Sequence, residues 1–142
     1  MIKIVVDTNI LVSTILSPQS SNRHLLQLCF EKRFLPVIST SLFLEYEDVL
    51  TRSHIVEKSP FSSQQRERLL NNFVHICQYT SIHYTWRPNL RDEGDNHVLE
   101  LALAANCKYI VTYNIKDFLH SELKFPWINI VTPKHLLEQL SQ

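Results

Sequence analysis

Carboxylate side chains follow apolar segments at four places along this chain of 142 residues. Asp7 comes directly after the apolar run IKIVV, Asp117 follows the run YIVT, and Asp92 and Asp95 precede an apolar helical pattern. Glu45 lies in the first turns of the helix expected after a second short strand. Because the carboxyl ends of parallel strands open on one edge of a sheet, these acids can meet although they are far apart in sequence. Carboxylates gathered in this way hold Mg²⁺ or Mn²⁺, so the spacing predicts a divalent metal site.

Each of these acids also has a purely structural interpretation. Asp7, Asp95 and Asp117 each precede or begin a helix or turn, where a carboxylate caps free backbone N–H groups. Glu45 and Glu47 lie on opposite edges of the same apolar helical stripe, so periodicity does not choose between them. The residues alone therefore leave both interpretations open.

Composition excludes several other kinds of site. One glycine in the chain cannot supply a glycine-rich phosphate loop. There is no CxxC pair and no second histidine at metal-ligand spacing, so zinc is not expected. Fourteen basic and fourteen acidic residues balance, so a nucleic-acid surface would have to be a local patch. Three cysteines, an odd number in apolar contexts, fit a reduced cytoplasmic protein.

Short apolar runs alternate with amphipathic stretches throughout the chain. The patterns predict strands at residues 2–6, 34–39, 81–86, 109–112 and 128–131. They predict helices at 8–16, 21–30, 41–52, 62–77, 96–105 and 133–140, with a capping box at Ser62 and Gln65 and a cap at Thr132-Pro133. Residues 53–61 read as a polar connection.

Helices between short apolar strands favour an α/β fold, a three-layer sandwich with a central parallel sheet. The length fits a single domain over residues 1–142. No apolar run approaches the about 20 residues that span a bilayer, and we expect a soluble, cytoplasmic protein.

Four segments, in this order and across nearly the full length, resemble the PIN-domain family, specifically its bacterial branch of VapC-like toxin ribonucleases. The segments are VVDTNIL, LEYEDVL, RDEGDNHVLELALA and VTYNIKDF. The resemblance implies an α/β/α sandwich, a cluster of acids that binds one or two divalent ions, and hydrolysis of single-stranded RNA by metal-activated water. It also implies products with 5′-phosphate and 3′-hydroxyl ends.

Transferred residue by residue, the resemblance identifies four catalytic and metal-binding acids and a set of supporting polar groups. The acids are Asp7, Glu45, Asp95 and Asp117. The supporting residues are Thr8, Asn9, Asp92, Thr112 and Asn114. Asn114 stands where many relatives have Asp, which leaves a site with less negative charge although an amide oxygen can still bind a metal.

RNA would also need cations near an acidic edge, because carboxylates repel phosphate. Basic or polar groups near the motif acids are the expected RNA contacts, and solvent-exposed loop charge is the competing interpretation. These residues are Arg87, Arg91, His97 and Lys116. The resemblance further implies an antitoxin protein partner and a homodimer or higher oligomer.

Two other functions compete with this one. A PIN-fold protein that binds RNA or a protein without cutting would retain the same fold. A haloacid-dehalogenase-like phosphohydrolase also ends its first strand in Asp, but that chemistry needs a second Asp two residues later, where this chain has Asn9.

Overall fold

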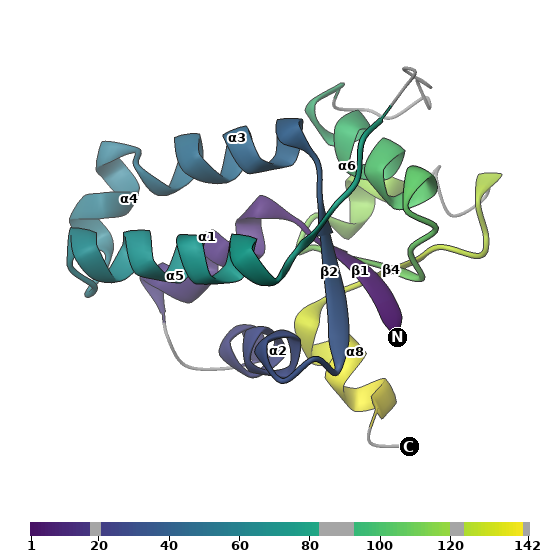
Figure 1. The fold of residues 1–142 in the computed structure, drawn as a ribbon, viewed down its shortest axis with the longest axis horizontal. Coiled ribbons are helices and arrows are strands. Elements are labelled where there is room, and N and C mark those ends of the chain that lie inside the picture. Colours follow the sequence, from purple (N-terminus) through teal and green to yellow (C-terminus); the bar gives the residue numbers. More distant parts are fainter. Residues whose placement is uncertain (18–20, 83–92, 120–123, 141–142) are drawn as a thin grey trace.

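A parallel sheet forms the centre of the protein (Figure 1). The computed structural model describes residues 1–17, 21–82, 93–119 and 124–140, and for residues 93–96 it describes the backbone alone. Within these residues, five parallel strands lie in the order β3-β2-β1-β4-β5. They are β1 (Ile2–Val6), β2 (Phe34–Ile38), β3 (Gln78–Tyr79), β4 (Tyr109–Val111) and β5 (Asn129–Val131).

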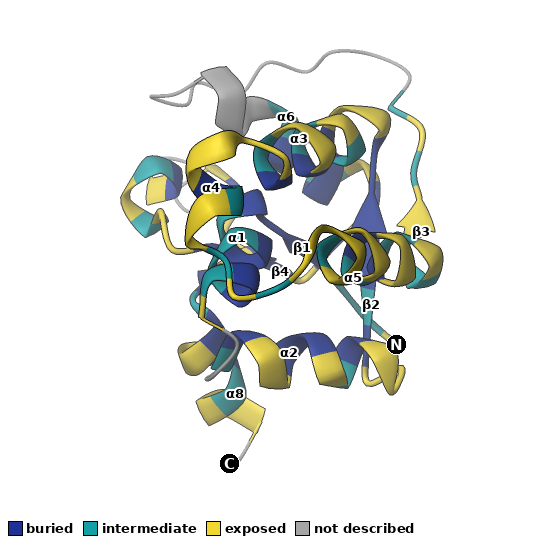
Figure 2. Cartoon of the chain, turned by 90° about the vertical axis from the view of Figure 1, so that its left-hand side faces the viewer, coloured by how far each residue is buried: buried dark blue, intermediate teal, exposed yellow. Residues whose placement is uncertain are grey.

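Helices cover both faces of this sheet. They are α1 (Thr8–Leu16), α2 (Ser21–Phe30), α3 (Thr40–Leu50), α4 (Ser53–Lys58), α5 (Ser63–Ile76), α6 (Glu93–Ala104), the 3₁₀ helix η1 (Ile115–Phe118) and α8 (Pro133–Leu140). Helix α6 packs on β1, β2 and β4, while α2 packs on β2 and against α8 on the opposite side (Figure 2). This arrangement confirms the three-layer α/β/α fold with a central parallel sheet.

Strand β1 lies at the middle of the sheet and is covered on both faces. Ile4, Val5 and Val6 are fully buried, as the dark blue of the central strands shows (Figure 2). A strand buried on both faces needs apolar side chains at consecutive positions, which explains the unbroken apolar run before Asp7.

Two predicted elements differ from the structure. Residues 53–58 form helix α4 instead of a polar connection. Ile55 is the only buried residue of this short helix, so no apolar periodicity marks it. Of the strand predicted at 81–86, residues 81–82 are not in a strand and residues 83–86 lie outside the described part of the chain, while the edge strand β3 comes earlier, at Gln78–Tyr79. Both β3 residues are exposed at the sheet edge, so they carry no alternating pattern.

The structure confirms two predicted helix caps and shifts the start of one helix. Ser62 Oγ accepts a hydrogen bond from Gln65 N at 3.1 Å, and Gln65 Oε1 accepts one from Ser62 N at 2.8 Å, which confirms the capping box. Thr132 Oγ1 accepts from the backbone N–H of His135 at 3.2 Å, which confirms the cap before α8. Helix α6 begins at Glu93, three residues earlier than expected.

The three cysteines are free and two of them are fully buried. Burial raises the pKa of the Cys29, Cys77 and Cys107 thiols to about 12 each. A thiolate nucleophile is therefore not available among them at neutral pH. None of the helices in the described ranges is both long and apolar enough to cross a membrane.

Candidate metal centre

The carboxyl ends of β1 and β4 meet at the point where the chain changes direction across the sheet. From β1 the chain moves to β2 on one side, and from β4 it moves to β5 on the other. Val6 pairs with Val111, so Asp7 and Thr112 emerge side by side, and Asp7 N donates to Val111 O at 2.9 Å. In open α/β sheets this switch point is where ligands bind.

Asp7 is buried, with 4% of the residue exposed, and its carboxylate accepts three hydrogen bonds. Oδ1 accepts from Thr8 N at 2.8 Å, which makes Asp7 the N-cap of α1. Oδ2 accepts from Thr112 Oγ1 at 2.7 Å and from Asn9 Nδ2 at 3.4 Å. The capping role and a supported carboxylate at the sheet edge therefore coexist in one residue.

Burial makes this carboxylate costly to ionise. Desolvation raises the pKa of Asp7, and the hydrogen bonds from Thr112 and Thr8 lower it by less. The negative charge of Glu45 raises the Asp7 pKa further. A cation between the two acids would offset both effects.

Glu45 reaches the same place from α3. Its Oε1 accepts from Thr8 Oγ1 at 2.8 Å, and its Oε2 contacts Nε2 of His97 on α6. Desolvation raises the pKa of Glu45, but the hydrogen bonds from His97 and Thr8, together with the charges of His97 and Arg52, lower it by more, so the pKa lies below its usual value and the carboxylate stays ionised near neutral pH. Glu47, its competitor on sequence grounds, is exposed.

A small cleft of about 280 Å³ opens between these groups. Its lining consists of Asp7, Thr8, Asn9, Val12, Glu45, Val49 and Asn114. The polar lining presents carboxylate, hydroxyl and amide groups, with no Lys, Arg, His or Cys among the described residues that line it. A cleft that offers oxygen ligands, including two carboxylates, and no cationic side chain to pair with them fits Mg²⁺ or Mn²⁺.

Thr112 and Asn114 connect the second strand to the cleft. Thr112 is fully buried, and its Oγ1 accepts from Asn9 Nδ2 at 3.2 Å and from Asn114 N at 3.0 Å while donating to Asp7. Asn9 Oδ1 in turn accepts from Tyr113 N at 3.3 Å. Asn9, Thr112 and Asn114, three of the five predicted supporting residues, thus connect the loop after β4 to the start of α1.

Of the remaining predicted residues, the structure describes the side chains of Asp117 and Lys116. Asp117 lies half-buried on η1, where its backbone N–H donates to Asn114 O at 3.1 Å, but it does not line the cleft. Lys116 is exposed on η1. Asp95 belongs to α6, but its side chain lies outside the described part, and Arg87, Arg91 and Asp92 lie wholly outside it. Among described side chains, no group of three or more His, Cys, Asp or Glu residues is arranged to hold a metal.

Two contacts at this site were not foreseen from the sequence. His97 contacts Glu45, although we expected it only as an RNA contact. Tyr46 is fully buried and donates its hydroxyl to the carbonyl oxygen of Val6 at 2.5 Å, one residue before Asp7. A tyrosine in a buried helical stripe needs a partner for its hydroxyl, and this was the available signal for that contact.

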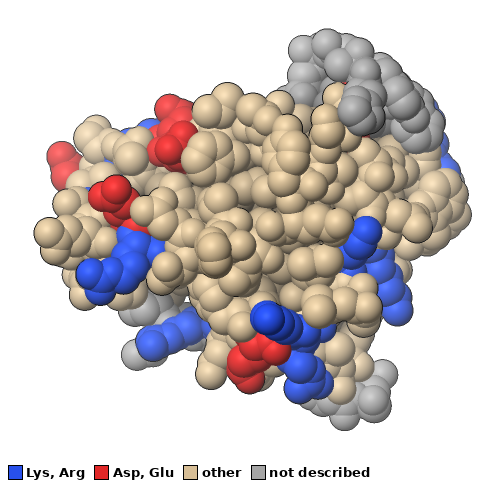
Figure 3. Space-filling model, in the orientation of Figure 1, with Lys and Arg blue, Asp and Glu red and all other residues tan. Residues whose placement is uncertain are grey.

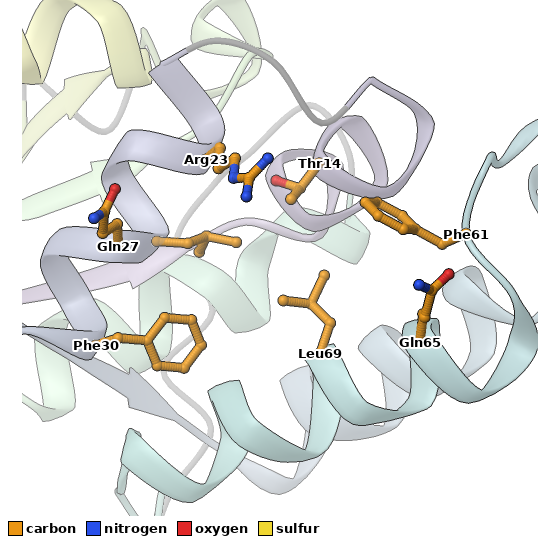
Figure 4. A pocket seen from close by; sticks show the side chains of 8 residues that line it. Thr14, Arg23, Gln27, Phe30, Phe61, Gln65 and Leu69 are labelled. Atoms are coloured by element: carbon orange, nitrogen blue, oxygen red, sulfur yellow. The ribbon is translucent and has the colours of Figure 1, made fainter.

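A larger cavity of about 400 Å³ lies elsewhere, between α1, α2 and α5 (Figure 4). Leu69 and Phe61 point into it, and Arg23 and Thr14 lie close together at one end. None of the described residues that line it carries a carboxylate. The carboxylates therefore line the smaller cleft, and the larger cavity is not the candidate metal site.

The chain belongs to the PIN domain family, whose model matches residues 3–116. An uncharacterized protein of Methanocaldococcus jannaschii is 26% identical over 156 residues, covering 99% of this chain and 93% of that protein. A crystal structure of VapBC2 from Rickettsia felis bound to a DNA fragment from their promoter is similar with a TM-score of 0.57. That similarity covers 91% of this chain and 97% of that chain at 20% identity, and it shows the shared fold.

Neutralising Asp7 is expected to change the pH dependence of stability in the metal-free protein. The folded state raises the pKa of Asp7, so the ionised carboxylate lowers the free energy of unfolding at neutral pH. This destabilisation disappears as the pH falls through the pKa of Asp7 in the folded state to below its pKa in the unfolded state. The stability of Asp7→Asn relative to wild type should therefore rise with pH across that window. Urea unfolding in EDTA at several pH values measures it, and a difference that falls with pH would contradict the assigned shift.

Replacing Thr112 by valine removes a buried hydroxyl that contacts three polar partners. We expect a loss of about 1–3 kcal/mol in the free energy of unfolding, because Asp7 loses a donor and Asn114 N loses an acceptor. Urea denaturation gives the value. Thr14→Val is the matched control, since Thr14 is also buried but its hydroxyl only bonds back to Ile10 O within α1. Equal losses in the two variants would show that the Thr112 contacts add nothing.

Proposed function

We propose that residues 1–142 form a divalent-metal-dependent ribonuclease that cleaves single-stranded RNA. The observation that carries the proposal is the convergence of Asp7 and Glu45, from β1 and α3, on an oxygen-lined cleft at the switch point of a PIN-domain sheet. Thr8 joins the two acids, since its backbone N–H donates to Asp7 and its hydroxyl donates to Glu45. Asp95 and Asp117 are the further acids that we propose complete the site.

The proposed division of labour follows from these contacts. Asp7 and Glu45 would bind Mg²⁺ or Mn²⁺ with Asp95 and Asp117, and Thr112 and Asn9 keep the Asp7 carboxylate in place. A divalent ion at such a site supplies an activated water and neutralises charge on the leaving oxygen. Water adds to phosphorus and the bond to the 3′ oxygen breaks, which leaves 5′-phosphate and 3′-hydroxyl ends.

Cationic groups near the cleft would hold the RNA phosphates. Lys116 is exposed on η1 and is the described candidate, and Arg87 and Arg91, which lie outside the described residues, are proposed as further contacts. On the face drawn in Figure 3, Lys and Arg lie apart around the margin, and the centre of the face is uncharged. Because basic and acidic residues balance over the chain, RNA binding would depend on a local set of cations and on the metal itself.

Cleavage of an unstructured RNA oligonucleotide tests this function. We expect cleavage with Mn²⁺ or Mg²⁺, none with EDTA, and recovery when the ion is restored. The products should be ligatable 5′-phosphate and 3′-hydroxyl ends. RNA binding that is equal with and without EDTA, and without any cleavage, would instead identify a binding module.

We further infer a VapC-like toxin in the cytoplasm, inhibited by an antitoxin protein and assembled as a homodimer. The likeness to a VapBC2 structure supports the inference of a toxin with an antitoxin partner, and the three free thiols support the inference of a reducing compartment. Expression of the wild type in a bacterial host should arrest growth, whereas Asp7→Asn should not. Co-expression of the adjacent gene should restore growth, and sedimentation should give the mass of a dimer. Unaffected growth with an active nuclease would indicate a nuclease that is not a toxin.

A further inference from the structure

His97 takes part in the acidic site without being one of its acids. It lies on α6, four residues after the helix begins, and its side chain is 20% exposed. Its Nε2 contacts Oε2 of Glu45, which comes from α3. Because an ionised carboxylate only accepts hydrogen bonds, Nε2 carries the proton in this contact.

Both oxygens of Glu45 are thereby held by the protein. Thr8 of α1 donates to Oε1 at 2.8 Å, and His97 of α6 donates to Oε2. A carboxylate offers about four lone-pair sites, so two donors leave sites that can face a cation. A free glutamate side chain loses about 1.5–2 kcal/mol of rotamer entropy when it is fixed, and these two contacts fix it before any ion arrives.

We propose that His97 is a positioning residue: its imidazole holds the Glu45 carboxylate in the orientation that binds the divalent ion. The inference rests on the proposed function, since it concerns the same metal. It replaces the expectation that His97 contacts RNA. The same contact joins α6, the helix that carries Asp95, to α3 next to the cleft.

A role in positioning and a role in RNA binding differ in what they disturb. Loss of a group that orients a metal ligand weakens metal affinity by about ten- to a hundredfold. Excess Mn²⁺ should then restore cleavage, and KM for RNA should stay near the wild-type value. Loss of an RNA contact would raise KM at every Mn²⁺ concentration and leave metal affinity unchanged.

Calorimetric titration of the full chain with Mn²⁺ tests the proposal with two amide variants of His97 that differ in length by one methylene. Glutamine can place an amide N–H where Nε2 lies, whereas the amide of asparagine is too short to reach Oε2. We expect His97→Asn to raise the Kd for Mn²⁺ by about tenfold or more and His97→Gln to retain most of the affinity. His135→Asn, on the exposed surface of α8, is the control and should match the wild type.

The outcomes separate this inference from the proposed function. If the wild type binds Mn²⁺, Asp7→Asn does not, and His97→Asn binds as tightly as wild type or more tightly, the positioning role is wrong while the metal site stands. Equal weakening by His97→Asn and His97→Gln also overturns it. If the wild type binds no Mn²⁺, the proposed function fails and this inference fails with it.

Discussion

Asp7→Asn is expected to lower kcat for RNA cleavage by at least about a hundredfold. Loss of a residue that only supports a metal ligand already lowers activity by up to about a hundredfold, and Asp7 is a proposed ligand itself. Asparagine keeps an oxygen that can accept from Thr8 N, so the cap of α1 and the fold should persist. What disappears is the negative charge at the end of β1, and with it the main attraction for a divalent ion.

Single-turnover cleavage at saturating Mn²⁺ measures this effect, with thermal melting to verify the fold. Asp48→Asn is the matched control, because Asp48 is an exposed acid on α3 that, among the described residues, forms an ion pair only with Arg52. That variant should cleave at the wild-type rate. Activity of Asp7→Asn within a fewfold of wild type would mean that the cleft is not the catalytic centre.

Phe73→Ala is expected to lower the free energy of unfolding by about 3–5 kcal/mol. Phe73 of α5 is fully buried and packs edge-on against Tyr46, with ring centroids 6.1 Å apart. Tyr46 in turn donates its hydroxyl to Val6 O at the end of β1. The cavity left by alanine would therefore remove packing from the side chain that holds the strand before Asp7.

Urea unfolding measures this loss, and Phe30→Ala provides the comparison. Phe30 packs edge-on against the same Phe73 ring at 6.5 Å but is 38% exposed, so its truncation should cost clearly less. A similar cost for the two variants would indicate that burial of Phe73 is not what stabilises this region.

Elements that bury a regular stripe or carry a local cap could be predicted from the sequence. The β1 run, the Ser62 capping box and the Thr132-Pro133 start of α8 are each encoded within a few residues. Helix α4 and strand β3 could not be found in this way. Their positions depend on how the chain packs around α3, α5 and β2, and few of their own side chains are buried.

The candidate site could also be predicted only in part, for the same physical reason. The position of Asp7 at a strand end, and its support by Asn9, follow from the sheet and from neighbouring residues. The contacts of Glu45 with Thr8 and His97 depend on how α1, α3 and α6 approach one another, with separations of 37 and 52 residues along the chain. Periodicity did not choose Glu45 over Glu47, and only the family motif did.

A crystal structure of the protein soaked in Mn²⁺ would show whether the acids at this edge of the sheet bind a divalent ion. We expect anomalous density for an ion bound by the carboxylate of Asp7 together with at least two of Glu45, Asp95 and Asp117. An ion that binds elsewhere, or that leaves Asp7 in contact with Thr8, Asn9 and Thr112 alone, would contradict this expectation.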